Sequence, residues 1–79
     1  MSLDTEQAEA RARLSANIKR LRQERGIAQE RLGLDAGVDR TVVSKIERQI
    51  ANPSLDVLVR LAVTLGVDVQ ELLAPNPKV

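Results

Sequence analysis

The sequence predicts an all-α protein, a compact bundle of five helices. Apolar residues recur at intervals of three and four along most of the chain, the spacing of one buried helix face. Glycine, proline or a capping Asp or Ser separates successive segments of this kind. No segment alternates strictly between apolar and polar residues, as a half-buried strand does. The 79 residues are enough for one domain.

We expect the first helix to run from about Thr5 to Arg25, with Asp4 or Thr5 as its cap. Gly26 ends it, because glycine enters the left-handed conformation at low cost. Residues 1–13 are either an N-terminal extension of this helix or partly disordered. Its buried stripe is Ala10, Leu14, Ile18 and Leu21.

The second helix is short, about Gln29 to Asp35, with Leu32 and Ala36 pointing inward. Gly33 lowers helix propensity and suits a position where another helix comes very close. Gly37 ends this helix. Asp39 then caps a third helix, about Arg40 to Arg48, by accepting a backbone N–H. The buried stripe of the third helix is Val43, Ile46 and Ile50.

Asn52-Pro53 breaks the chain, and Ser54 caps a fourth helix that ends at Leu65 before Gly66. Its inward residues are Leu55, Leu58, Ala62 and Leu65. Asp68 caps a short fifth helix that contains Val69, Leu72 and Leu73. The domain therefore covers residues 14–74, and prolines in residues 75–79 leave a frayed C-terminal tail.

Composition excludes several classes of function. Without cysteine or histidine, the chain lacks thiolate ligands, the commonest metal ligand and the usual general base. We therefore expect no enzyme, no metal, no cofactor and no small-molecule ligand. Without aromatic residues, it cannot stack nucleobases as single-strand and RNA platforms do. No apolar run approaches about 18 residues and the N-terminus is not a secretory signal, so we expect no membrane contact and a cytoplasmic protein.

Charge is unevenly distributed although the net charge is only +1. Residues 1–10 carry three acidic side chains, and residues 11–25 carry six basic ones against a single Glu. Taken alone, such a basic block is typical of a solvated helix face.

The segment 28–48 combines a short helix, a turn with glycine and a capped helix, which is a helix-turn-helix. Such a unit lays the outward face of its second helix in the DNA major groove. Arg40 can fork onto guanine O6 and N7, Thr41 and Val42 can meet a thymine methyl, and Lys45 can reach guanine or phosphate. The candidate base-reading residues are Arg40, Thr41, Val42, Ser44 and Lys45. For Ser44, the alternatives are a solvated residue or a phosphate contact.

From Leu14 to Leu73 the chain resembles the Cro and lambda-repressor type of helix-turn-helix domain, the Xre family. The resemblance rests on Leu21-Arg22, Arg25-Gly26, Gln29-Glu30-x-Leu32, Gly37-Val38, Ser44-x-Ile46-Glu47-Arg48, Asn52-Pro53-Ser54-Leu55 and Leu65-Gly66-Val67. Asp39-Arg40-Thr41 followed by Ser44-x-Ile46-Glu47-Arg48 is most similar to the small controller proteins of restriction–modification systems.

The resemblance implies further roles. Gln29, Arg48 and Asn52 would contact the DNA backbone, and Arg22 and Glu47 would form a partly buried ion pair. The chain departs from the family where Ala28 replaces a capping Ser or Thr, Gln49 a common glycine, and Ile50 and Ala51 residues that are often basic.

These features favour a sequence-specific regulator of transcription, a repressor or controller that binds double-stranded DNA as a homodimer on a palindromic operator. The candidate dimer interface is Leu65, Val67, Val69, Leu72 and Leu73. Contact with RNA polymerase through an exposed acid such as Glu30 stays open. The alternative is a protein-interaction module of the same fold, such as an antitoxin or adaptor subunit, which would use Leu34, Val57 and Val63. Val59 is expected in the peripheral core.

Overall fold

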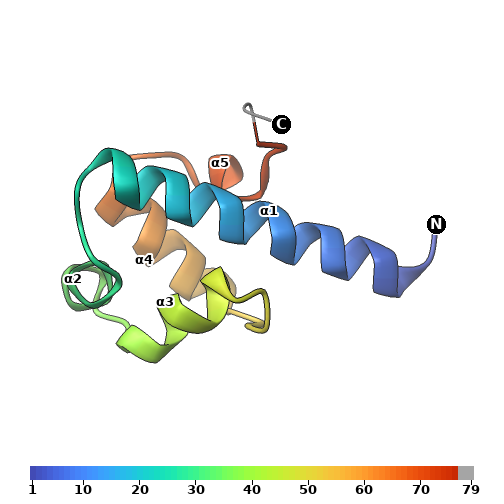
Figure 1. Ribbon diagram of the computed structural model, residues 1–79, viewed down its shortest axis with the longest axis horizontal. Helices are drawn as coiled ribbons and strands as arrows, with labels where there is room; N and C mark the ends of the chain where they lie inside the picture. The colour runs from blue at the N-terminus through green and yellow to red at the C-terminus, as the bar shows by residue number, and fades with distance from the viewer. Residues whose placement is uncertain (77–79) are drawn as a thin grey trace.

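The computed structural model describes residues 1–76, and these form helices without any strand. The helices are α1 (Leu3–Glu24), α2 (Gln29–Ala36), α3 (Arg40–Glu47), α4 (Leu55–Leu65) and α5 (Val69–Leu73). The other helices gather around the C-terminal half of α1, while its N-terminal half projects beyond them (Figure 1). The all-α prediction is confirmed. Of the expected tail, residues 77–79 lie outside the described residues.

The start of α1 differs from the prediction. Ser2, rather than Asp4 or Thr5, is the N-cap, and its Oγ accepts a hydrogen bond from the Thr5 N–H at 3.1 Å. Residues 1–10 are exposed, so Ala10 does not belong to the core as expected. Ala10 lines an open hollow that it shares with Leu73 of α5, so close packing does not cover its side chain. Residues 3–13 form the first turns of α1 itself.

The caps of the later helices are as predicted. The side chains of Asp39, Ser54 and Asp68 each accept a backbone N–H at the start of their helices. Ala28 precedes α2 and makes no side-chain cap, so α2 relies on its packing. Gln49 has a φ of 64°, a left-handed conformation that costs strain for a residue other than glycine.

The core lies between the C-terminal half of α1 and the other four helices. Two predicted core residues are wrong, since Ile50 is 61% exposed and Leu55 is 68% exposed. Helix α3 ends at Glu47, so helical spacing no longer holds at Ile50. The buried face of α4 is centred on Leu61 and Ala62, which places Leu55 on its flank. The core consists of Leu14, Ile18, Leu21, Leu32, Ala36, Val43, Ile46, Leu58, Leu61, Ala62, Leu65 and Leu72.

Two buried polar residues of α1 hold other elements in place. Ser15 Oγ donates to the backbone carbonyl of Glu47 at 2.7 Å, at the C-terminal end of α3. Asn17 Nδ2 donates to the carbonyls of Leu72 and Ala74 at 3.0 and 2.8 Å, where α5 ends. Buried polar groups are tolerated when they are hydrogen-bonded in this way. Through these bonds α1 fixes both α3 and α5.

Candidate nucleic-acid interface

The crossing of α2 and α3 depends on a residue without a side chain. A Cβ on Gly33 would lie 3.0 Å from the carbonyl oxygen of Val38 and 3.2 Å from the Cα of Arg40. Both are backbone atoms, so they cannot rotate away. Gly37 has a φ of 72° and ends α2, and the N–H of Val38 bonds back to the carbonyl of Gly33 at 2.9 Å. The close crossing and the tight turn together fix the angle at which α3 leaves the body of the domain.

The N-terminus of α3 is capped by Asp39. Its Oδ1 accepts hydrogen bonds from the N–H and the hydroxyl of Thr41, both at 2.8 Å. The backbone N–H of Thr41 is the main cause that lowers the pKa of the Asp39 carboxyl, and the Thr41 hydroxyl adds to it. The carboxylate is therefore ionised at neutral pH and holds the Thr41 side chain in one orientation. The Thr41 methyl group then has a fixed direction at the surface.

The five predicted base-reading residues do not share one environment. Arg40, Thr41 and Lys45 are exposed, as a groove-reading face requires. Ser44 is half-buried. Val42 packs against the core, so only part of its side chain is available at the surface. The exposed face of α3 therefore consists of three of the five predicted residues, and Ser44 lies beside them.

A charged network beneath α3 ties the interface to α1. Glu47, which is 6% exposed, accepts from Arg22 Nε at 2.8 Å and from Arg22 Nη2 at 3.1 Å. Arg22 Nη1 donates to the carbonyl of Ile27 at 2.9 Å, just before α2 begins. Gln29 Nε2 donates to the same Glu47 carboxylate at 3.0 Å. The ion pair expected between Arg22 and Glu47 is present, and it joins α1, α2 and α3 at one point.

The protonation of Glu47 reflects opposing influences. Burial is the largest single influence and raises the pKa, because it penalises the charged carboxylate. The hydrogen bonds from Arg22 and Gln29, with the charges of Arg22 and Lys19, outweigh burial and leave the pKa below its ordinary value. The pKa of Arg22 is raised, chiefly by the hydrogen bond to Glu47. Both groups are therefore charged at neutral pH.

The three predicted backbone-contacting residues are placed differently. Gln29 is the first residue of α2, and its side-chain amide donates a hydrogen bond to Glu47. Its backbone N–H is therefore the group that could contact a phosphate. Arg48 and Asn52 are exposed on either side of the left-handed Gln49, in the segment between α3 and α4. In the chain, Gln29 precedes α3 and the other two follow it, while the bond to Glu47 places the Gln29 side chain beside the last residue of α3.

One polar contact at the interface was not expected from the sequence. Glu30 Oε2 lies 3.5 Å from Arg40 Nη1, and both side chains are largely exposed, at 74% and 70%. The two residues line a shallow hollow between α2 and α3, together with Gln29, Thr41 and Ser44. An exposed ion pair of this length contributes little to stability. The contact places the Arg40 guanidinium beside Glu30 at the edge of this hollow.

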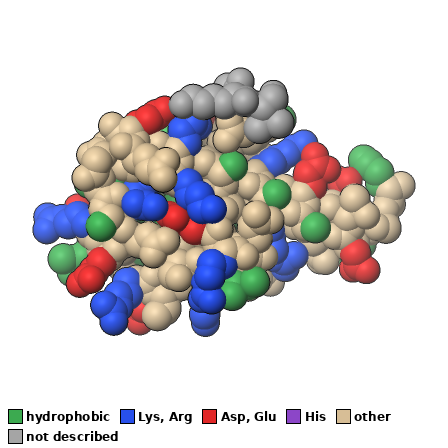
Figure 2. All heavy atoms as spheres, in the orientation of Figure 1, with side chains coloured by type: hydrophobic (Ala, Val, Ile, Leu, Met, Phe, Trp, Pro, Cys, Tyr) green, Lys and Arg blue, Asp and Glu red, His purple; other side chains and the backbone are tan. Residues whose placement is uncertain are grey.

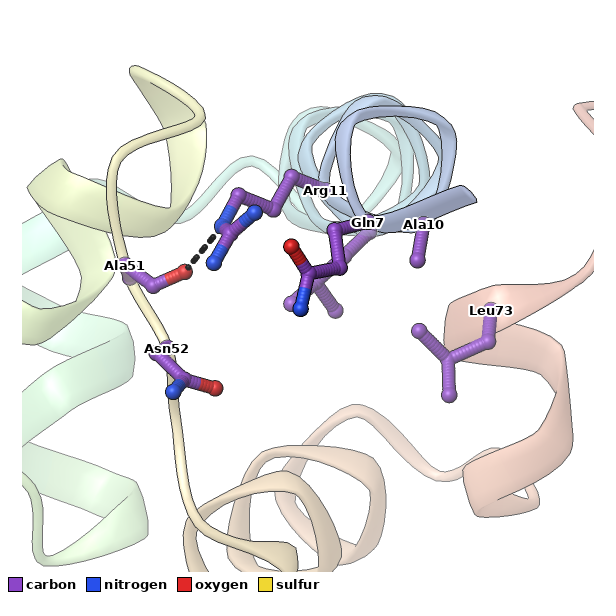
Figure 3. Close-up of a pocket in the computed structure, with 7 residues that line it drawn as sticks. Gln7, Ala10, Arg11, Ala51, Asn52 and Leu73 are labelled. Carbon is purple, nitrogen blue, oxygen red and sulfur yellow. Dashed lines mark hydrogen bonds between the residues drawn. The ribbon is translucent and has the colours of Figure 1, made fainter. Parts of the chain in front are cut away.

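A second hollow lies behind the segment that follows α3. Figure 3 shows Arg11 reaching from α1 toward this segment, with Gln7, Asn52 and Leu73 around the same space. Arg11 Nε donates to the carbonyl of Ala51 at 3.1 Å. The projecting half of α1 is therefore tied to the segment that carries Arg48 and Asn52.

Surface charge differs between the two ends of the molecule. Figure 2 shows Lys and Arg side chains over the whole bundle, with acidic side chains among them at the lower left, and a group of acidic side chains on the projecting end of α1. The acidic residues there are Asp4, Glu6 and Glu9, while α3 and its following turn carry Arg40, Lys45 and Arg48. Residues 26–48 carry four basic and four acidic side chains, so this region has no net charge, and the acidic end of α1 is the less favourable place for a polyanion.

The predicted dimer interface divides into core and surface. Leu65 and Leu72 are 1% and 0% exposed within the single chain, so they pack α4 and α5 onto the domain. Val67 and Val69 are half-buried against the core. Leu73 is the member with the most free surface, at 40% exposed. Of the other apolar candidates, Leu34 and Val63 are exposed at 70% and 74%.

Two assignments for α4 are reversed. Val57, expected at a partner surface, packs against the core, while Val59, expected in the peripheral core, is 42% exposed.

Within residues 1–76, no group of three or more acidic side chains is placed to hold a metal ion. Nor does any helix in that range combine the length and the apolar character needed to cross a membrane.

Comparison with known families gives one match over most of the folded region. The family model described as Helix-turn-helix matches residues 18–72. A curated relative, the Neisseria hypothetical transcription factor of Neisseria meningitidis serogroup B, is 37% identical over 70 residues. The match covers 89% of this chain and 66% of that relative.

Solved structures share the same arrangement of helices. The crystal structure of the hypothetical transcription factor NHTF from Neisseria has a TM-score of 0.82 and 39% identity, covering 87% of this chain and 78% of that one. The restriction-modification controller protein C.AhdI from Aeromonas hydrophila has a TM-score of 0.73 and 33% identity, covering 76% and 91%. The N-terminal DNA-binding domain of SinR from Bacillus subtilis gives 0.76 and 34%, covering 81% and 94%. None of these names describes an enzyme.

Proposed function

Because this chain belongs to the Xre type of the helix-turn-helix family, we propose that it is a transcriptional regulator that binds double-stranded DNA in a sequence-specific manner. The observation that carries the proposal is the exposed face of α3. Arg40 and Thr41 in its first turn and Lys45 in its last turn are all exposed, on a helix capped by Asp39. A helix presented in this way fits the major groove.

The rigidity of the interface supports base reading rather than charge attraction alone. The close crossing at Gly33 sets the angle of α3, and the network of Arg22, Gln29 and Glu47 holds its underside. A side chain must be held in a defined place to distinguish base edges, whereas phosphate attraction needs no such precision. We assign Arg40 to a guanine, Thr41 to a thymine methyl, and Lys45 to a guanine or phosphate. Val42 and Ser44, less exposed, would add contacts at the edge.

Backbone contacts would frame this face. The N–H of Gln29 opens α2 without a side-chain cap on Ala28, an arrangement suited to a phosphate oxygen. Arg48 and Asn52 would contact the phosphates at the other end of α3. These contacts set the register of the protein on the duplex, while the α3 side chains select the sequence.

We further propose that the chain acts as a homodimer on a palindromic operator. One domain presents one recognition helix, and a two-fold dimer presents two, about 34 Å apart on one side of the duplex. A relative whose name is restriction-modification controller protein supports a controller role. Repression would follow from occlusion of the promoter. Glu30 lies beside Arg40, so contact with RNA polymerase through that acid would have to coexist with DNA at the same place.

Replacement of Arg40 tests the base-reading assignment. Arg40→Ala should weaken binding to the cognate operator by about 1–3 kcal/mol and relax its specificity at one position. Random duplex DNA should be affected much less. Arg13→Ala is the matched control, since Arg13 lies on α1 and pairs with Glu9 at the surface. Equal loss on cognate and random DNA, measured by titration at physiological salt, would contradict the assignment.

The alternative of a protein-interaction module is favoured by one observation, the exposure of Leu34 and Val63 at 70% and 74%. Salt separates the two functions. A DNA-binding protein loses affinity steeply as salt rises, because phosphate contacts release counterions. No binding to any duplex at low salt, with stable capture of a second protein that Leu34→Lys abolishes, would replace the DNA proposal by this one.

A further inference from the structure

Arg11 ties the middle of the segment between α3 and α4 to α1. Its Nε donates to the backbone carbonyl of Ala51 at 3.1 Å, across 40 positions of the sequence. Figure 3 shows the guanidinium reaching from α1 to this carbonyl. Arg11 precedes residues 18–72, the stretch that matches the family model. The contact therefore comes from the N-terminal extension of α1 and not from the matched domain.

Local contacts fix the two ends of this segment but not its middle. The N–H groups of residues 48–50 donate to carbonyls in α3, each at 3.0 Å. At the other end, Ser54 caps α4. Residues 50–54 have no regular secondary structure. The peptide between Ala51 and Asn52 therefore depends on contacts from other elements for its orientation.

Side-chain packing does not set that orientation. The methyl group of Ala51 packs against the core, but a methyl contact does not direct the carbonyl of the same residue. Beside the peptide is the hollow of Figure 3, lined also by Gln7, Ala10 and Leu73. Asn52 is exposed and takes part in no hydrogen bond within residues 1–76. The bond from Arg11 is therefore the directional contact that this peptide makes.

The direction of the Ala51 carbonyl determines what the segment offers to a ligand. This carbonyl and the N–H of Asn52 belong to one planar trans peptide, so they point in opposite directions. Because the carbonyl points to Arg11 on α1, the N–H of Asn52 points away from α1. Asn52 also precedes Pro53, which restricts its backbone to extended conformations. The segment thus presents an unused donor of fixed direction.

The charge of Arg11 strengthens this donor. The other arginines of α1, which are Arg13, Arg20 and Arg22, each pair with a carboxylate. Within residues 1–76, Arg11 belongs to no ion pair, so its positive charge is not neutralised. A cation bonded to a carbonyl polarises the peptide and makes its N–H a better donor. An anion is therefore the ligand that this N–H favours.

We propose that Arg11 is a positioning residue for DNA binding, which turns the N–H of Asn52 toward a phosphate oxygen of the duplex. Backbone N–H groups are ordinary phosphate contacts and set the register of a protein on DNA. Arg48, exposed in the same segment, supplies a cation for the same strand of phosphates. The inference rests on the proposed function and adds to it a role for the N-terminal extension of α1.

The first measurement needs no DNA. The NMR order parameter of the Asn52 N–H reports how firmly the peptide is held. We expect about 0.85 in the wild-type chain and less than about 0.6 in Arg11→Met. Methionine keeps the apolar stem and the helix propensity of arginine, so α1 should stay intact, which circular dichroism checks. Arg13→Met is the matched control and should keep the wild-type value, since Arg13 pairs with Glu9.

The second measurement is ethylation interference on an operator enriched from randomised DNA. The wild-type chain and Arg13→Met should show the same set of phosphates whose ethylation blocks binding. In Arg11→Met, one of these phosphates for each bound domain should cease to matter. Affinity should fall by about tenfold, the loss of one hydrogen bond to a charged group. Interference at the guanine assigned to Arg40 should persist, whereas a general structural defect would not remove one phosphate and spare that guanine.

Three results would overturn the inference while the wild-type chain still binds DNA. The order parameter of Asn52 could stay at the wild-type value in Arg11→Met, which would show that the peptide needs no tie to α1. The set of interfering phosphates could stay unchanged in the same variant. A phosphate could be lost without any change in the order parameter, which would mean that Arg11 contacts that phosphate itself. If the wild-type chain binds no duplex, the proposed function fails and the inference fails with it.

Discussion

At the scale of single residues, Glu47 is the point on which the interface depends. Its carboxylate is buried and receives hydrogen bonds from Arg22 and Gln29, which come from two different helices. Burial of a charge is tolerated when it is paired and hydrogen-bonded. The same arrangement makes either partner difficult to remove, because the remaining charge stays in the interior.

We expect Arg22→Met to lower the free energy of unfolding by about 3–5 kcal/mol, since it leaves the Glu47 carboxylate buried without its cation. The control is Arg13→Met, whose partner Glu9 is half exposed and whose loss should cost at most about 1 kcal/mol. Urea denaturation of both variants measures the difference. Equal, small losses would show that the network contributes little to stability.

Glu47 also predicts a dependence of stability on pH. Its pKa is lower in the folded chain than its ordinary value of 4.5. A group of this kind stabilises the fold above its unfolded pKa, and that contribution is lost as pH falls through the folded pKa. The free energy of unfolding should therefore decline below about pH 4.5. Glu47→Gln should show a shallower decline over the same range, and an unchanged slope would contradict the assignment.

At the scale of elements, the helix boundaries follow from local chemistry. Asp39, Ser54 and Asp68 cap their helices as the sequence predicts, because a cap depends on a few neighbouring residues. The errors at Ile50 and Leu55 have another origin. Which flank of a helix is covered depends on where the neighbouring helices lie, and this information is not local.

Within the candidate site, the exposure of Arg40, Thr41 and Lys45 could be predicted from the sequence, because the cap fixes where α3 starts and so which of its residues face outward. The contacts between segments that are distant in the sequence could not be predicted. Asn17 bonds to the end of α5, and its one signal in the sequence is a polar residue beside the apolar stripe of α1. Glu30 meets Arg40 only because α2 and α3 cross so closely.

The α2–α3 crossing gives a prediction at this scale. Gly33→Ala should favour α2 by about 1 kcal/mol of helix propensity, yet destabilise the domain overall, because the new Cβ meets backbone atoms at 3.0 and 3.2 Å. A net loss of about 1–3 kcal/mol and weaker specific DNA binding are expected. Thermal unfolding and DNA titration measure both. A variant with unchanged stability and unchanged DNA affinity would show that the α2–α3 crossing can accommodate a Cβ at this position.

At the scale of the whole molecule, the rest of the bundle holds the candidate DNA-reading helix α3 in place. Helix α3 is held by α1 through Ser15 and the Glu47 network. The sequence predicted the bundle and the helix-turn-helix. Of the predicted dimer-interface residues, Leu65 at the end of α4 and Leu72 in α5 are buried in the core of the single chain, while Leu73 keeps free surface.

The measurement that tests the central claim most directly is selection from a randomised duplex DNA library at physiological salt, performed with the full chain and with Arg40→Ala. We predict that the full chain enriches a two-fold symmetric sequence whose half-sites are separated by about one helical turn. Arg40→Ala should lose preference at one base pair in each half-site. Failure of the full chain to enrich any sequence, with binding equal across the library, would contradict the claim that α3 reads bases.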